Sequence, residues 1–213
     1  MVLPKSAFTK REWELIQNLR TPAQVQRFLS NLAYNYETEG PTCMSFRSVI
    51  RKGRAHCLEG ALVAATILEQ HGYEPLLVSI ESRDKLDHVL FLYKRGGRFG
   101  SVARSRDIGL HGRKPVFRTV RDLVMSYYDP YIDKTGCITG YAVADLRDLG
   151  SYDWRFSEKN VWKVERYLQE IPHRPVRASM RRYRKWYARY QEFKRQVPDG
   201  SPDYFPNRNV WML

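Results

Sequence analysis

One cysteine of the chain lies where its thiol could act as a nucleophile. Cys57 follows Gly53-Arg54-Ala55-His56 and opens an apolar run to Leu68 that predicts a buried helix. A thiol reacts as its thiolate, and the positive end of a helix lowers the pKa of a thiol placed there. The unpaired backbone N–H groups of the same turn could bind an oxyanion. Cys57 is therefore the candidate nucleophile, and a small buried hydrophobic side chain is the alternative interpretation.

A histidine at the start of a predicted strand is the candidate base. His88 lies in the apolar segment Asp87 to Lys94, and a strand holds a base rigidly, as proton transfer requires. His56 is next to Cys57 in sequence, but adjacent residues of a helix point apart, so it is the weaker partner. The other histidines are expected at a helix end or in loops: His71, His111 and His173.

Metal and cofactor sites are not expected. The three cysteines (Cys43, Cys57 and Cys137) are scattered, without the paired spacing of a disulfide framework or a zinc site. The glycine pair Gly96-Gly97 lies in a predicted hairpin and not between a strand and a helix, so it does not predict a phosphate-binding loop. We expect no metal, no organic cofactor, and structural roles for Cys43 and Cys137.

Helices are predicted on both sides of the candidate nucleophile. The segments with helical spacing of apolar residues are Thr9–Arg20, Pro22 through Tyr36 with an end at Gly40-Pro41, Ser45–Lys52, Cys57–Leu68 and Thr119–Tyr128. A further amphipathic helix is expected after Ser157, which would cap it. The Cys57–Leu68 helix is apolar nearly all round and is therefore expected at the centre of the fold.

After the predicted central helix, the spacing of apolar residues changes from helical to strand-like. The strand-like segments are Glu74–Ser82, Asp87–Lys94, Arg98–Arg104 and Gly140–Leu146. Gly96-Gly97 predicts a tight turn between the second and third of these strands. The sequence therefore predicts a central helix followed by an antiparallel meander.

This order of elements resembles the transglutaminase-like superfamily, a branch of the papain-fold proteins whose core is a cysteine helix, a histidine strand and an aspartate strand. The matching stretch runs from about Gly53 to Asp107. Within it, GRAHCLEGALVAATILEQHGYEP is similar to the family's cysteine motif, and LDHVLFLYKRGGRFGSV is similar to its histidine strand and hairpin. The resemblance implies a papain-like core in which Cys57 is the nucleophile and His88 its base.

The family's third catalytic residue, an aspartate that orients the imidazole, has no match in this chain. Phe99 matches the aromatic residue that precedes it, and the aspartate position falls on Ala103, whose side chain cannot accept a hydrogen bond. Ser101 and Ser105 lie on the same strand face, and Ser101 is the candidate substitute orienting group. Because the third group mainly fixes tautomer and orientation, a cysteine–histidine dyad can still act. A thiol site that binds without turnover is the alternative.

Two carboxylates lie near this position in the sequence. Asp107 could reach the imidazole only if the third strand ends early. Asp87 is adjacent to His88, and successive residues of a strand face opposite sides, so we expect it to point away.

The overall composition is that of a soluble chain with an unusual charge. Hydrophobic residues make up 43% of the 213 positions and the formal net charge is +13. No apolar run is long enough for a membrane span, and the N-terminus does not have the pattern of a signal peptide, which favours a cytoplasmic protein with reduced thiols. Such a positive charge is typical of proteins that meet nucleic acid, an anionic surface or an acidic partner.

The positive charge is concentrated near the C-terminus. Between His173 and Gln196 many Arg and Lys residues alternate with aromatic residues at helical spacing, and the tail after Pro198 is expected to be irregular. One interpretation is a nucleic-acid contact. The other, which the regular spacing favours, is a helix whose aromatic side chains pack on the core while its arginines stay in water.

We therefore expect an α+β protein in which a papain-like, transglutaminase-type core has a central buried helix packed on an antiparallel sheet, with flanking helices. Residues 1–172 would form this domain with its N-terminal helices, and residues 173–213 a basic aromatic extension. The expected activity is a cysteine-dependent hydrolase or acyltransferase acting on an amide or related acyl bond of a peptide, protein or small amide. The alternative is a noncatalytic binding protein that uses its basic surface on nucleic acid or an acidic partner.

Overall fold

The strand-like segments form one antiparallel sheet. In the computed structural model, which describes residues 3–213, the strand order is β6-β5-β4-β3-β7-β8, and every neighbouring pair is antiparallel. The strands are β3 (Leu76–Ser82), β4 (His88–Arg95), β5 (Arg98–Val102), β6 (Arg113–Phe117), β7 (Ile138–Asp145) and β8 (Arg174–Pro175). Gly96 and Gly97 both have positive φ, as a tight hairpin turn requires, so the predicted meander is confirmed.

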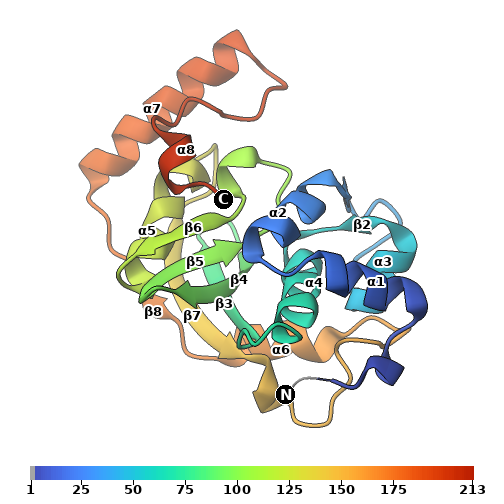
Figure 1. Ribbon diagram of the computed structural model, residues 1–213. Helices are drawn as coiled ribbons and strands as arrows, with labels where there is room; N and C mark the ends of the chain where they lie inside the picture. Colours follow the sequence, from blue (N-terminus) through green and yellow to red (C-terminus); the bar gives the residue numbers. More distant parts are fainter. Residues whose placement is uncertain (1–2) are drawn as a thin grey trace.

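The central helix α4 (Cys57–Glu69) covers one face of this sheet (Figure 1). Every residue of α4 after Cys57 is buried, and its apolar side chains share a core with Val89, Phe91 and Tyr93 of β4. Gly60 allows a close approach, because a Cβ atom there would lie 2.7 Å from the Cβ of Arg104. The position of α4 in the core is therefore determined by apolar packing and by one glycine.

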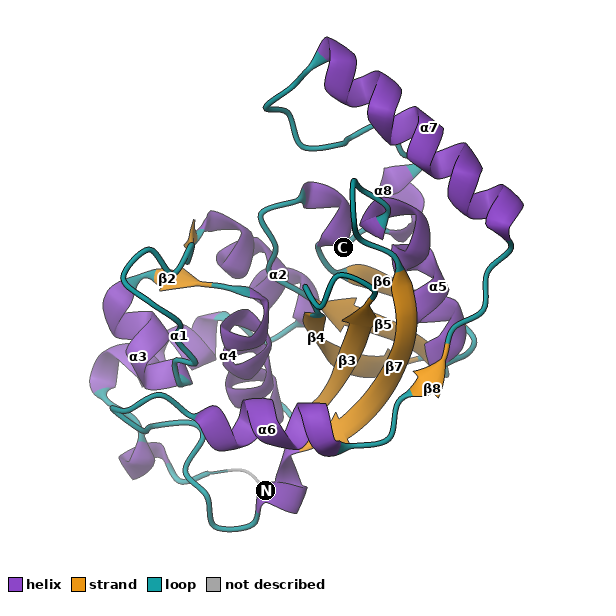
Figure 2. Ribbon diagram, turned by 180° about the vertical axis from the view of Figure 1, so that it is seen from behind, coloured by secondary structure: helices purple, strands orange, loops and turns teal. Residues whose placement is uncertain are grey.

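The opposite face of the sheet is covered by α5 (Val120–Tyr131), so helices lie on both sides (Figure 2). The second core joins Leu123, Val124 and Tyr127 of α5 to Val78 of β3 and Leu90 of β4. The molecule is thus an α+β fold with an antiparallel sheet between two helical layers.

The N-terminal helices begin at the expected caps. Thr9, Thr21 and Ser45 each accept a hydrogen bond from a backbone N–H three residues later. The N-terminal elements are η1 (Lys5–Ala7), α1 (Lys10–Asn18), α2 (Pro22–Asn31) and α3 (Phe46–Lys52). The expectation that the second helix continues to Tyr36 is wrong. The chain leaves α2 at Asn31 because β1 (Ala33–Tyr34) pairs in parallel with β2 (Arg54–Ala55), next to Cys57.

The C-terminal third differs from the sequence-based expectation at two points. Helix α6 (Trp162–Glu170) begins five residues after Ser157, whose hydroxyl instead accepts a hydrogen bond from Lys159 N within the preceding turn. The tail expected to be irregular contains a short helix, α8 (Arg208–Trp211). The other short helices are η2 (Ile108–Leu110) and η3 (Leu146–Leu149).

The basic segment forms the helix α7 (Met180–Gln196), which projects from the body of the molecule (Figure 2). Its aromatic residues Tyr183, Trp186 and Tyr187 are partly buried against the second core. The aromatic spacing therefore packs this helix on the fold, as the sequence favoured. Across residues 3–213, no helix has both the length and the apolar character needed to span a membrane.

Candidate active site

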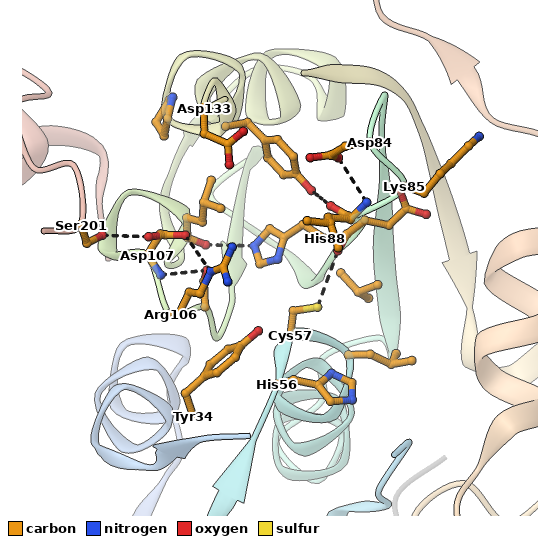
Figure 3. A pocket seen from close by; sticks show the side chains of 18 of the residues that line it. Tyr34, His56, Cys57, Asp84, Lys85, His88, Arg106, Asp107, Asp133 and Ser201 are labelled. Carbon is orange, nitrogen blue, oxygen red and sulfur yellow. Dashed lines mark hydrogen bonds and ion pairs between the residues drawn. The ribbon is translucent and has the colours of Figure 1, made fainter. Parts of the chain in front are cut away.

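A cleft of about 690 Å³ opens at the N-terminal end of α4. Cys57 and His88 both line it, together with parts of the β1 segment, the turn before β4, the loop after β5 and the end of α7 (Figure 3). The two side chains that the sequence singled out are therefore brought together in one accessible cavity.

Cys57 is the first residue of α4 and is half-buried, with its Sγ 3.9 Å from the backbone oxygen of Asp87. Cys43 and Cys137 are buried. Cys43 Sγ lies 3.6 Å from Val161 O, and Cys137 Sγ lies 3.2 Å from Tyr128 Oη. Of the three thiols, Cys57 alone lines the cleft.

The Cys57 thiol is strongly acidified. Burial on its own would raise its pKa, but the neighbouring His56 and His88 side chains, which favour the negatively charged thiolate, outweigh burial and lower the pKa to about 5. At neutral pH the sulfur is therefore a thiolate, which is the reactive form of cysteine.

His88 is the first residue of β4, and its side chain is buried next to Cys57 (Figure 3). Its Nε2 atom lies 3.0 Å from the carbonyl oxygen of Leu110. Because a carbonyl can only accept, Nε2 must carry a proton, and Nδ1 of the neutral ring is left with a free lone pair. The rings of Tyr127 and Tyr131 flank the imidazole, with centroids 5.9 and 6.5 Å away. The backbone carbonyl thus selects the tautomer that leaves Nδ1 free to accept a proton.

A second imidazole acts on the thiol. His56 precedes α4 as its N-cap, and its Nε2 atom lies 3.0 Å from Thr42 O and 3.4 Å from Glu59 Oε1. Burial would lower the pKa of His56, but the Cys57 thiolate and Glu59 raise it to about 9. His56 is therefore an imidazolium at neutral pH, paired with a thiolate.

His56 was ranked as the weaker partner by a rule for two helical neighbours, and that rule does not apply to it. His56 precedes the helix with extended backbone angles, φ −91° and ψ −173°. A signal was present in the sequence, because Glu59 follows His56 by three residues, the spacing of a capping box.

Glu59 is a completely buried carboxylate that holds this arrangement together. It accepts hydrogen bonds from Thr42 Oγ1 at 2.7 Å, His56 N at 2.9 Å, and both Asn35 Nδ2 and Met44 N at 3.0 Å. A carboxylate can be buried when its lone pairs are satisfied in this way. Glu59 therefore ties the segment 35–44 to the first turn of α4.

The other residues proposed to orient His88 are engaged elsewhere. Ser101 Oγ lies 2.7 Å from Tyr127 Oη and accepts a hydrogen bond from Arg113 N. Asp87 Oδ1 accepts from Ser82 N, and Ser105 Oγ accepts from Asp107 N. In the described part of the chain His88 Nε2–H donates to Leu110 O alone, so the structure does not bring Ser101 to the imidazole.

Ala103, at the expected aspartate position, lies beyond the end of β5. Its backbone N–H and carbonyl both bond to the side chain of Gln26, at 2.9 Å each. Gln26 Oε1 also accepts from Gly112 N, so this one side chain closes the neck of the loop 104–112. We call residues 104–112 the carbonyl loop, since it presents the Leu110 carbonyl to His88.

The cleft lining is acidic although the chain is basic. Seven carboxylates line it against three Lys or Arg side chains: Glu37, Asp84, Asp87, Asp107, Asp133, Glu165 and Asp199 against Lys85, Arg106 and Lys194. Over residues 3–213, no group of three or more His, Cys, Asp or Glu side chains is arranged to hold a metal ion.

Comparison with known proteins gives limited similarity. No protein-family model and no curated protein matches the chain. Two solved structures of LapG from Legionella pneumophila are similar at low sequence identity. The EGTA-treated form is 11% identical with a TM-score of 0.40, and the other is 10% identical with a TM-score of 0.38. Each alignment covers 70% of this chain and 89% of the other. Similarity at this level assigns neither a family nor an activity.

The pH dependence of Cys57 alkylation tests the electrostatics of this site. We expect the rate with iodoacetamide, followed by mass spectrometry, to rise with a midpoint near pH 5 and to be flat at neutral pH. In His56→Gln the imidazolium is lost, so the thiol pKa should rise by about 1–3 units and the midpoint should move upward with it. A Cys57→Ser variant is the control for labelling elsewhere. A wild-type midpoint near the ordinary thiol value, about 8.5, would contradict the assignment.

Proposed function

We propose that this chain is a cysteine-dependent enzyme of the transglutaminase-like type that acts on an amide or related acyl bond. The observation that carries the proposal is the Cys57 thiolate at the first position of α4, next to His88, whose Nε2–H is held by Leu110 O. A thiolate, an oriented imidazole and a helix N-terminus are the parts that acyl transfer through a thiol needs.

The reaction would proceed in two steps. The Cys57 thiolate attacks the substrate carbonyl carbon, and the first-turn N–H groups of α4 stabilise the oxyanion. In the reactive ion pair with the thiolate, His88 carries a proton on Nδ1 as well as on Nε2, taken from the attacking water or amine in the preceding deacylation. His88 gives this Nδ1 proton to the leaving group, the carbon–leaving-group bond breaks, and a thioester remains on Cys57. Neutral Nδ1 of His88 then takes a proton from water or an amine, which attacks the thioester and releases the thiolate. Hydrolysis and acyl transfer share the same acyl-enzyme.

The arrangement of elements supports the same proposal. We infer a transglutaminase-type core formed by α4 packed on the consecutive antiparallel strands β3, β4 and β5, in the chain order cysteine before histidine. The carbonyl of Leu110 takes the place of the missing aspartate, since it fixes the imidazole as a carboxylate would. We further propose residues 1–172 as the catalytic domain and 173–213 as its extension, of which residues 1 and 2 lie outside the described chain. The open cleft suits a segment of a peptide or protein as well as a small amide.

A nitrophenyl acyl ester tests the proposed catalysis. We expect nitrophenol release with an initial burst, and we expect Cys57→Ala to abolish it because the thioester can no longer form. His88→Asn should slow turnover by roughly 10²–10⁴-fold, since proton transfer to and from the imidazole is lost.

Cys137→Ala is the matched control, because this thiol is buried against Tyr128. It should keep the wild-type burst. Release by Cys57→Ala at the wild-type rate would refute the proposed nucleophile.

The second candidate function is a contact with a polyanion, and a specific surface favours it. The exposed side of α7 carries Arg181, Arg184 and Lys185, none of which forms an ion pair with any residue that the structure describes. We call these three residues the basic ridge. The aromatic side chains of α7 face the body instead, so the ridge offers contacts to phosphates without stacking on bases. The acidic cleft would repel a nucleic acid, so the two functions occupy different surfaces.

Salt dependence tests the basic ridge. We expect a DNA duplex to bind with an affinity that falls steeply with salt, because counterions are released. Arg181→Gln, Arg184→Gln and Lys185→Gln together should reduce the slope of log affinity against log salt by about 3. The matched control replaces three exposed cations near α1, Lys10→Gln, Arg11→Gln and Arg20→Gln. An equal loss in both triple variants would show that only net charge matters.

A further inference from the structure

A buried arginine without a counter-ion lies behind the carbonyl loop. Arg113 is the first residue of β6 and is completely buried. No carboxylate within residues 3–213 forms an ion pair with it, and burial lowers its pKa to about 10. A buried charge without an anion is unfavourable unless its hydrogen-bond donors are satisfied, so its persistence needs an explanation.

The guanidinium is satisfied almost entirely by backbone carbonyls and aromatic rings. One terminal nitrogen donates to His111 O at 2.6 Å and the other to Gly109 O at 2.7 Å, while Nε donates to Ser126 Oγ at 3.1 Å. The rings of Tyr127 and Trp211 both pack against the guanidinium, with centroids 3.8 and 4.5 Å from Cζ. The two carbonyls that accept from the terminal nitrogens, Gly109 O and His111 O, belong to the residues on either side of Leu110.

This pattern determines where the Leu110 carbonyl points. The carbonyls of Gly109 and His111 turn to the guanidinium, and the carbonyl between them turns to Nε2 of His88. Tyr127 Oη also donates to His111 O at 3.0 Å. The Gly109 and His111 carbonyls on either side of Leu110 are each bonded to a buried cation, so a rearrangement of the loop around Leu110 would break those bonds.

We propose that Arg113 is the positioning residue for His88: it orients the Leu110 carbonyl, which in turn selects the Nε2–H tautomer. The inference rests on the proposed function for its consequence in catalysis. Arg113 does not touch substrate or the imidazole, and it acts through the carbonyl loop. Its hydrogen bonds fix the direction of a backbone acceptor, in the same way that supporting hydrogen bonds fix the orientation of a catalytic side chain.

Ser101 belongs to the same support. Its hydroxyl accepts from Arg113 N and bonds to Tyr127 Oη, which holds His111 O. The residue expected to replace the aspartate is therefore separated from His88 by three hydrogen bonds, and it supports the loop whose Leu110 carbonyl accepts from the imidazole.

The planar fork of arginine suits this task, and lysine does not. The guanidinium bonds three separate acceptors in fixed directions, whereas an ammonium is a single point with a flexible stem. Arg113→Lys keeps the positive charge and loses the geometry. It is therefore the most informative substitution, because charge alone cannot explain its effect.

The experiment measures the tautomer of His88 and the rate of acyl turnover in the same variants. Nitrogen-15 NMR of the His88 imidazole, recorded at a pH high enough for the ring to be neutral, should show the Nε2–H form in the wild type and a mixture with Nδ1–H in Arg113→Lys. Turnover of the nitrophenyl ester should fall roughly 10- to 100-fold in kcat with little change in KM, because the base is misoriented and the cleft is intact. Ser126→Ala, which removes one contact of the guanidinium, should change both readouts in the same direction by less.

Arg155→Lys is the matched control, since Arg155 makes two bonds to Glu69 at the far end of α4. It should leave the tautomer unchanged whatever it does to stability. A wild-type tautomer and rate in Arg113→Lys would overturn the inference, and Ser126→Ala decides the question if that variant does not fold. A wild type with no ester turnover would refute the proposed function alone, because the tautomer still reports on Arg113.

Discussion

The site depends on a carboxylate that no solvent reaches. Glu59 lies in the first turn of α4 and satisfies its lone pairs with Asn35, Thr42, Met44 and His56. These bonds determine how the chain enters the central helix, and they stabilise the His56 imidazolium beside the thiol. Behind the carbonyl loop, Arg113 is buried without a carboxylate partner among residues 3–213 and donates to the carbonyls of Gly109 and His111. The buried carboxylate of Glu59 thus positions the chain on the Cys57 side of the site. The buried guanidinium of Arg113 positions the carbonyl loop on the His88 side.

In the proposed reaction the two histidines would divide the work that one imidazole performs in a simple dyad. His56 is anchored to Glu59 and Thr42 and compensates the charge of the thiolate. His88 is anchored to a neutral carbonyl, so its Nδ1 is free to gain and lose a proton during a reaction. A base held by a carbonyl receives orientation without the extra negative charge of an aspartate. In the proposed reaction this would keep the base oriented although Ala103 stands at the position where an aspartate was expected.

Much of this arrangement was predictable from sequence, and the rest was not, for identifiable reasons. The apolar run after Cys57 and the glycine turn at Gly96-Gly97 predicted the central helix and the meander, because packing periodicity is local information. The orienting group was missed because a backbone carbonyl has no sequence signature, and Leu110 looks like any loop residue. His56 was ranked low because a rule for helical neighbours was applied to an extended N-cap. The end of α2 at Asn31 depends on pairing with β2, which is not a local property.

The central claim is that acyl groups pass through Cys57, and the most direct measurement is the location of a trapped acyl group. The protein is incubated with an activated acyl ester, quenched in acid and digested, and its peptides are mapped by mass spectrometry. The account predicts a thioester on the peptide that contains Cys57, present in the wild type and accumulating in His88→Asn, whose thioester is released more slowly. Acylation confined to lysines, or equal on all three cysteines, would contradict it.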